Sequence, residues 1–81
     1  MLENKIIKYM FYAGLECCNK YKLAIPKIVV DQTTKKFGLD ENTGQKELLH
    51  YAREICKKIN KMSDLEINSK LKEIRDRRWK R

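Results

Sequence analysis

The sequence has few of the residues on which metal sites and disulfide-stapled domains depend. Its 81 residues include one histidine, His50, and three cysteines, Cys17, Cys18 and Cys56. An odd cysteine count without a C-x-x-C pair does not fit a disulfide framework, and it predicts a reducing, cytoplasmic location. A helix would turn His50 and Cys56 apart, so we expect no metal site. Cys17 and Cys56 are expected to be small core residues.

Patterns that enzymes use are also missing. The chain shows no Ser-His-Asp order and no glycine-rich phosphate loop. The one candidate nucleophile is Cys18, because the nearby Lys20 would lower the pKa of its thiol. A chain this short offers little room for an oriented base and a pocket. We therefore predict that the protein is not an enzyme and uses no cofactor.

Long apolar runs are absent as well. No segment approaches the ~18 apolar residues of a membrane span, so we expect no membrane partner. Charges begin at Glu3 and no small-residue cleavage site follows, so we expect no signal peptide. With 42% hydrophobic and 37% charged residues, the composition favours a folded domain over a disordered chain. The length predicts a single helical domain over residues 1–81.

Helical periodicity is strongest at the start of the chain, over residues 2–22. Its apolar stripe comprises Ile6, Met10, Ala13, Cys17 and Tyr21. The apolar arc is broad, which suits a central helix touched by two neighbours or a helix that meets a partner chain. Gly14 costs about 1 kcal/mol in a helix interior, and its presence predicts the close approach of another helix.

Residues 23–38 combine strand and helix signals. The β-branched residues at 28–30 favour a strand by propensity. Pro26, however, suits the first turn of a helix, and Gly38 suits a left-handed cap residue after its end. Together these residues predict a short helix over 26–37.

Two further helices are predicted by capping boxes. Asn42 with Gln45 places the start of one near Thr43, and Ser63 with Glu66 starts the other. Their apolar stripes are Leu48, Ala52, Ile55, Ile59 and Met62, and then Ile67, Leu71 and Ile74. We predict an all-α fold, a small bundle of three to four helices, with a basic helical extension over about 70–81 that leaves the core.

The charge is strongly positive and unevenly placed. The net charge is +8. Residues 70–81 contain seven basic and two acidic residues, whereas residues 38–56 carry a net charge of −2. A basic surface attracts polyanions because neutralising phosphates releases condensed counterions. Trp79, between two basic residues, is suited to stacking on an exposed base.

The segment 26–60 resembles a helix-turn-helix. A short helix, a turn at Gly38, an inward Leu39 and a second helix follow one another in the expected order. Acidic residues at 40, 41 and 47 oppose a DNA contact there, and ordinary helix capping explains the same pattern. Both interpretations stay open.

These observations favour a small basic nucleic-acid-binding protein, more plausibly a DNA-binding than an RNA-binding regulator or accessory factor. Its predicted contacts are Lys35, Lys36, Thr43, Gln45, Lys46, His50, Lys57, Lys58, Lys61, Arg75, Arg77, Arg78, Trp79, Lys80 and Arg81. The alternative is a protein-binding module, an inhibitor or assembly adaptor that docks on an acidic or apolar partner surface. Its support is the first helix, where Tyr9, Phe11 and Tyr12 are expected to be exposed. The same helix would serve a homodimer.

Overall fold

Four helices and no strand make up the described part of the chain. The computed structural model describes residues 3–39 and 45–79, apart from the side chains of residues 77–79. The helices are α1 (Asn4–Tyr21), α2 (Pro26–Phe37), α3 (Gln45–Asn60) and α4 (Asp64–Trp79). The all-α prediction is confirmed, including a helix rather than a strand at 26–37. None of the described helices has the length and apolar character required to cross a bilayer.

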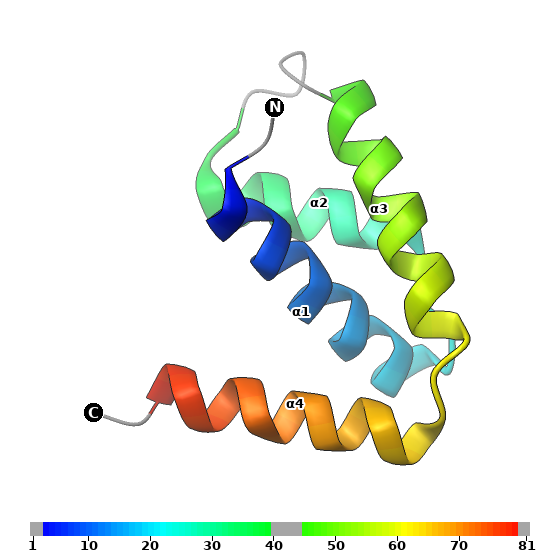
Figure 1. Cartoon of the computed structure of the whole chain (residues 1–81). Helices are drawn as coiled ribbons and strands as arrows, with labels where there is room; N and C mark the ends of the chain where they lie inside the picture. The colour runs from blue at the N-terminus through cyan, green and yellow to red at the C-terminus, as the bar shows by residue number, and fades with distance from the viewer. Residues whose placement is uncertain (1–2, 40–44, 80–81) are drawn as a thin grey trace.

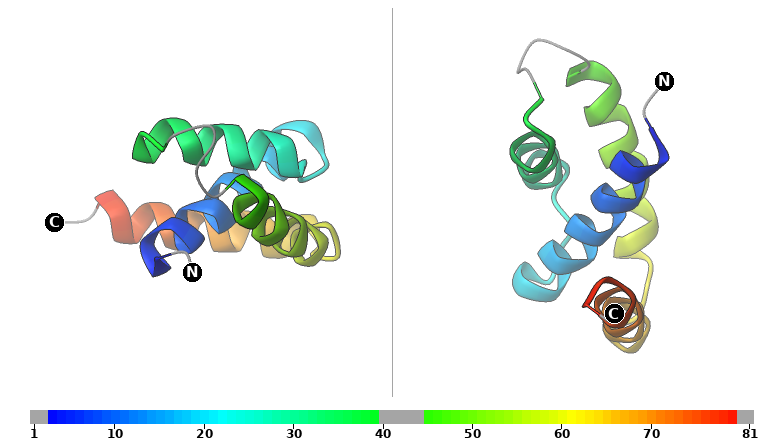
Figure 2. Two further views of the ribbon diagram at one scale, coloured as in Figure 1. Left: turned by 90° about the horizontal axis from the view of Figure 1, so that it is seen from above. Right: turned by 90° about the vertical axis from the view of Figure 1, so that its left-hand side faces the viewer.

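The first helix is the centre of the molecule. It packs against α2, α3 and α4, while α2 and α3 also pack against each other (Figure 1). Seen from the side, α2 and α4 lie on opposite sides of α1 (Figure 2). Three neighbours explain the broad apolar arc of α1, since each covers a different part of its circumference.

The predicted stripe of α1 is buried except at its end. Met10 and Leu15 are fully buried, and the stripe residues at 6, 13 and 17 are buried with them. Tyr21 is 52% exposed, so the predicted stripe runs one turn too far. The reason is that α1 ends at this residue and Lys22 takes a left-handed conformation, with φ 65°.

At Gly14, α1 and α3 approach each other closely. A Cβ atom built on this glycine would lie 2.6 Å from Cδ1 of Ile59, which is itself fully buried. The predicted close approach of another helix at Gly14 is therefore confirmed, and α3 is that helix.

Local signals set the ends of α2 as the sequence predicts. Pro26 occupies the first turn, and Gly38 has φ 62° as the left-handed residue after the helix. The N–H of Leu39 donates a hydrogen bond to the Thr34 carbonyl at 3.0 Å. The described part of α3 begins at Gln45. The predicted cap at Asn42 and Thr43 lies outside the described residues.

The fourth helix begins at the predicted capping box and packs on α1. The N–H of Glu66 donates to Ser63 Oγ at 3.2 Å, while the Ser63 N–H donates to Glu66 Oε1 at 3.4 Å. Ile67 and Leu71 are buried, and Ile74 is half-buried. The helix continues to residue 79. The segment from residue 70 onward therefore begins as part of a packed helix.

Candidate nucleic-acid interface

One face of α3 is basic and exposed over most of its length. Lys46, His50, Arg53 and Lys57, here named the α3 stripe, recur at i, i+4, i+7 and i+11, and all four are exposed. Lys61 follows four residues later and is exposed as well. The stripe extends about 16 Å along the helix axis. It can face a polyanion because the opposite side of α3 is held in the core.

Arg53 is not among the contacts predicted from the sequence. Its helical spacing places it on this surface, between His50 and Lys57. These three residues line a shallow hollow of about 420 Å³ together with Ala24 and Pro26. The α3 stripe is therefore bordered by the connection between α1 and α2.

Negative charge also lies on α3. Glu54 is exposed and lines the same hollow, and Glu47 is half-buried in the first turn. Gln45, a predicted base contact, is half-buried at the start of the helix. Of the predicted base contacts that the structure describes, Lys46 and His50 are thus the exposed ones.

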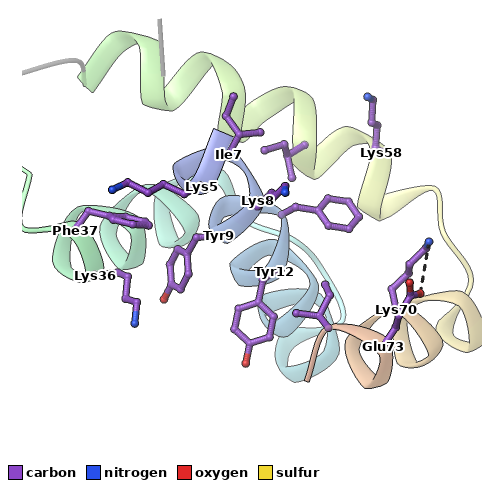
Figure 3. Close-up of a pocket in the computed structure, with 13 residues that line it drawn as sticks. Lys5, Ile7, Lys8, Tyr9, Tyr12, Lys36, Phe37, Lys58, Lys70 and Glu73 are labelled. Carbon is purple, nitrogen blue, oxygen red and sulfur yellow. Dashed lines mark ion pairs between the residues drawn. The ribbon is translucent and has the colours of Figure 1, made fainter. Parts of the chain in front are cut away.

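Lys36 and Lys58 belong to a second surface, an open groove of about 850 Å³. This basic-rimmed groove is lined by Lys5, Ile7, Lys8, Tyr9, Phe11, Tyr12, Lys36, Phe37, Ile55, Lys58, Lys70, Glu73 and Ile74. Figure 3 shows that α1 forms its middle, with α2 at one end and α4 at the other. It shares no residue with the α3 stripe.

The aromatic residues of α1 form the floor of this groove. Tyr9, Phe11 and Tyr12 are half-buried and pack against the core, so they are less exposed than predicted. The ring of Tyr9 meets that of Phe37 edge to face, with centroids 5.6 Å apart. The Nζ atom of Lys36 lies 6.0 Å from the centroid of the Tyr9 ring.

The other predicted contacts fall elsewhere. Lys35 is exposed near the end of α2. Arg75 donates a hydrogen bond of 2.5 Å to Glu16 Oε1, which connects α4 to α1. This hydrogen bond raises the pKa of the Arg75 guanidinium. Thr43, Lys80, Arg81 and the side chains of Arg77, Arg78 and Trp79 lie outside the described part of the structure.

The side chains of the three cysteines lie inside the fold. All three are buried, as was predicted for Cys17 and Cys56, and the Cys17 thiol donates to the Leu23 carbonyl at 3.4 Å. Burial raises the pKa of the Cys18 thiol, and it raises the pKa of Cys56 to about 11. A nucleophilic cysteine needs the opposite shift, so the expectation of a lowered thiol pKa at Cys18 is wrong. Among the described residues, no three metal-ligating side chains gather in one place.

Comparisons with protein-family models, with curated proteins and with solved structures find no match to this chain.

Proposed function

We propose that this protein binds nucleic acid, with duplex DNA as the favoured ligand, as a small regulator or accessory factor. The observation that supports this most strongly is the alignment of Lys46, Arg53 and Lys57 on one exposed face of a single helix. The major groove of DNA is about 12 Å wide and admits an α-helix. A basic stripe on such a helix meets phosphates on both sides of the groove.

Within this proposal, the two ends of α3 have different tasks. Lys46 and His50 lie toward the N-terminus of the helix, the part that contacts base edges in helix-turn-helix proteins. Lys57 and Lys61, near the other end, neutralise phosphates. The α2–α3 pair then acts as a variant of the helix-turn-helix. The described ends of this pair are Gly38, which follows α2, and Gln45, where the described part of α3 begins.

The basic end of α4 supplies a second set of phosphate contacts in this proposal. Four of the last five residues of the sequence are Arg or Lys. Leu71 is buried, so removing the last twelve residues would damage the core as well as the charge. Ending the chain after Asp76 keeps Leu71 and Ile74 and tests the basic end alone. We expect this truncation to lower the salt dependence of binding without unfolding the protein.

Salt titration of binding tests the contribution of the α3 stripe. The affinity of a fluorescein-labelled DNA duplex is measured by anisotropy at several salt concentrations. Each phosphate contact adds about 1 to the slope of log affinity against log salt. The triple variant Lys46→Ala, Arg53→Ala, Lys57→Ala should therefore reduce the slope by roughly 3 units.

A matched control removes the same charge from other exposed positions, Lys5, Lys8 and Lys27. We expect this control to keep a slope close to that of the unchanged protein. Equal slopes for the two variants, or no binding to duplex or single strand, would contradict the proposal.

A further inference from the structure

The basic-rimmed groove points to a second ligand, of a different kind from nucleic acid. We propose that it binds an acidic amphipathic helix of a partner protein. This inference does not rest on the proposed function, because the groove and the α3 stripe have no residue in common.

The floor of the groove is suited to aliphatic and aromatic side chains. Ile7, Ile55 and Ile74 come from three different helices, and they join the aromatic rings of α1 and α2 in one concave surface. All but Ile55, which is buried, belong to the half-buried apolar residues that pack against the core. A concave apolar surface of this kind receives the apolar face of a helix, in the binding mode used by many helix-in-groove complexes.

The rim of the groove determines the charge of the partner. Five lysines and one glutamate line it. The Nζ atom of Lys70 lies 4.0 Å from Oε2 of Glu73, and the Nζ atom of Lys5 lies 3.4 Å from Oε2 of Glu3. Among the described residues, no carboxylate lies within ion-pair distance of Lys8, Lys36 or Lys58. Acidic side chains beside the apolar face of a partner would meet these three lysines.

The same charge argues against a second copy of this chain as the occupant. Each copy carries a net charge of +8, so two copies would repel each other at this rim. Stacked nucleobases fit the groove less well than a helix. The rings of Phe37 and Tyr9 already meet edge to face, and the Nζ atom of Lys36 lies 6.0 Å from the centroid of the Tyr9 ring, so these two rings already have partners.

A designed peptide pair tests the proposal directly. The probe is a fluorescein-labelled helical peptide about 18 residues long, with leucines at i, i+3, i+4 and i+7 and glutamates on its flanks. The control peptide carries lysine in place of every glutamate. We expect the acidic peptide to bind, with an affinity that falls as salt is raised, and the basic peptide not to bind.

Paired variants of the protein locate the binding site. The double variant Lys36→Glu, Lys58→Glu reverses two rim charges on exposed side chains. It should lower the affinity for the acidic peptide about tenfold or more. Lys27→Glu with Lys72→Glu makes the same charge change outside the groove and should alter the affinity less than threefold. Far-UV circular dichroism confirms that both variants keep their helices.

Several results would overturn the inference. One is that both variant pairs lower the affinity for the acidic peptide equally. The others are that the two peptides bind equally well, or that the acidic peptide does not bind. Single-stranded DNA or anionic lipid vesicles are added as competitors. If either binds more tightly than the peptide and depends on Lys36 and Lys58, the groove is a site for nucleic acid or for a membrane surface. None of these results bears on duplex binding by the α3 stripe, which the triple variant tests separately.

Discussion

At the scale of single residues, the contact between α1 and α3 depends on the absence of a side chain at Gly14. Alanine is about 1 kcal/mol better than glycine in a helix interior. At this position, however, the added Cβ would meet Ile59 Cδ1 at 2.6 Å, and Ile59 is fully buried. Overpacking costs about 1–3 kcal/mol, and a cost near the middle of this range exceeds the helical gain by about 1 kcal/mol. We predict that Gly14→Ala lowers the free energy of unfolding by about 1 kcal/mol, measured by urea denaturation.

A double-mutant cycle separates this clash from other effects of the alanine. Ile59→Val removes the Cδ1 atom and alone should cost about 1 kcal/mol. In the double variant the new methyl group occupies the space that Cδ1 leaves. The double variant should therefore be more stable than Gly14→Ala alone. Additive losses would show that Ile59 does not limit the space at Gly14.

We predict that the buried thiol of Cys56 lowers the free energy of unfolding in alkaline solution. The pKa of its thiol is raised from 9.0 to about 11 because the side chain is buried. Between these two values the unfolded chain has released a proton that the folded chain still holds, so stability falls as pH rises. The thiol alone should account for a loss of about 1 to 2 kcal/mol between pH 8 and 11.

This contribution is measured as a difference between two proteins, because lysines and tyrosines titrate in the same range. The free energy of unfolding of the unchanged protein and of Cys56→Ala is followed from pH 8 to pH 11. The unchanged protein should lose more stability than the variant. Parallel curves would mean that the Cys56 thiol is no harder to ionise in the fold than in the unfolded chain.

At the scale of elements, one asparagine fastens the α1–α2 connection to the end of α3. The Ala24 N–H donates to Asn60 Oδ1 at 2.8 Å, and Asn60 Nδ2 donates to the Ala24 carbonyl at 3.2 Å. Ala24 and Asn60 are 36 residues apart in the sequence. Their two hydrogen bonds therefore connect the α1–α2 connection to the end of the unit formed by α1, α2 and α3.

We predict that Asn60→Ala lowers the free energy of unfolding by about 1 to 2 kcal/mol, because both Ala24 groups lose their partner. Asn60→Asp keeps an acceptor for the N–H but loses the donor to the carbonyl, so it should also destabilise. The comparison is Asn68→Ala, at an exposed position within α4, which should be neutral or slightly stabilising. Equal effects at the two positions, measured by thermal unfolding, would argue against a special role of Asn60.

The sequence predicts most of the elements because their signals are local. Pro26 and Gly38 determine the ends of α2, and Ser63 with Glu66 determines the start of α4, through bonds between near neighbours. The Asn60 pair with Ala24 and the Arg75 pair with Glu16 could not be found in this way. Each joins residues far apart in the chain, and no periodicity specifies a single hydrogen bond between two loops or helices.

At the scale of the whole molecule, the basic residues of α3 are divided between the α3 stripe and the basic-rimmed groove. Composition predicts a basic protein but not this division, since it depends on which side of each helix is buried. Lys57 and Lys58 show the reason. They are neighbours in sequence, yet they lie about 100° apart around α3. Lys57 therefore joins the α3 stripe, and Lys58 lines the groove. A count of charges along the sequence ignores this rotation, so it does not place Arg53 beside Lys57.

Mapping of amide chemical shifts by NMR during titration with a DNA duplex tests the central proposal most directly. At low salt, we predict shifts at Lys46, His50, Arg53 and Lys57 and at the basic end of α4, with the groove residues Tyr9 and Phe11 unchanged. Raising the salt should reverse these shifts as the phosphate contacts are lost. Shifts centred on the groove, or a spectrum that the duplex leaves unchanged, would contradict duplex binding by the α3 stripe.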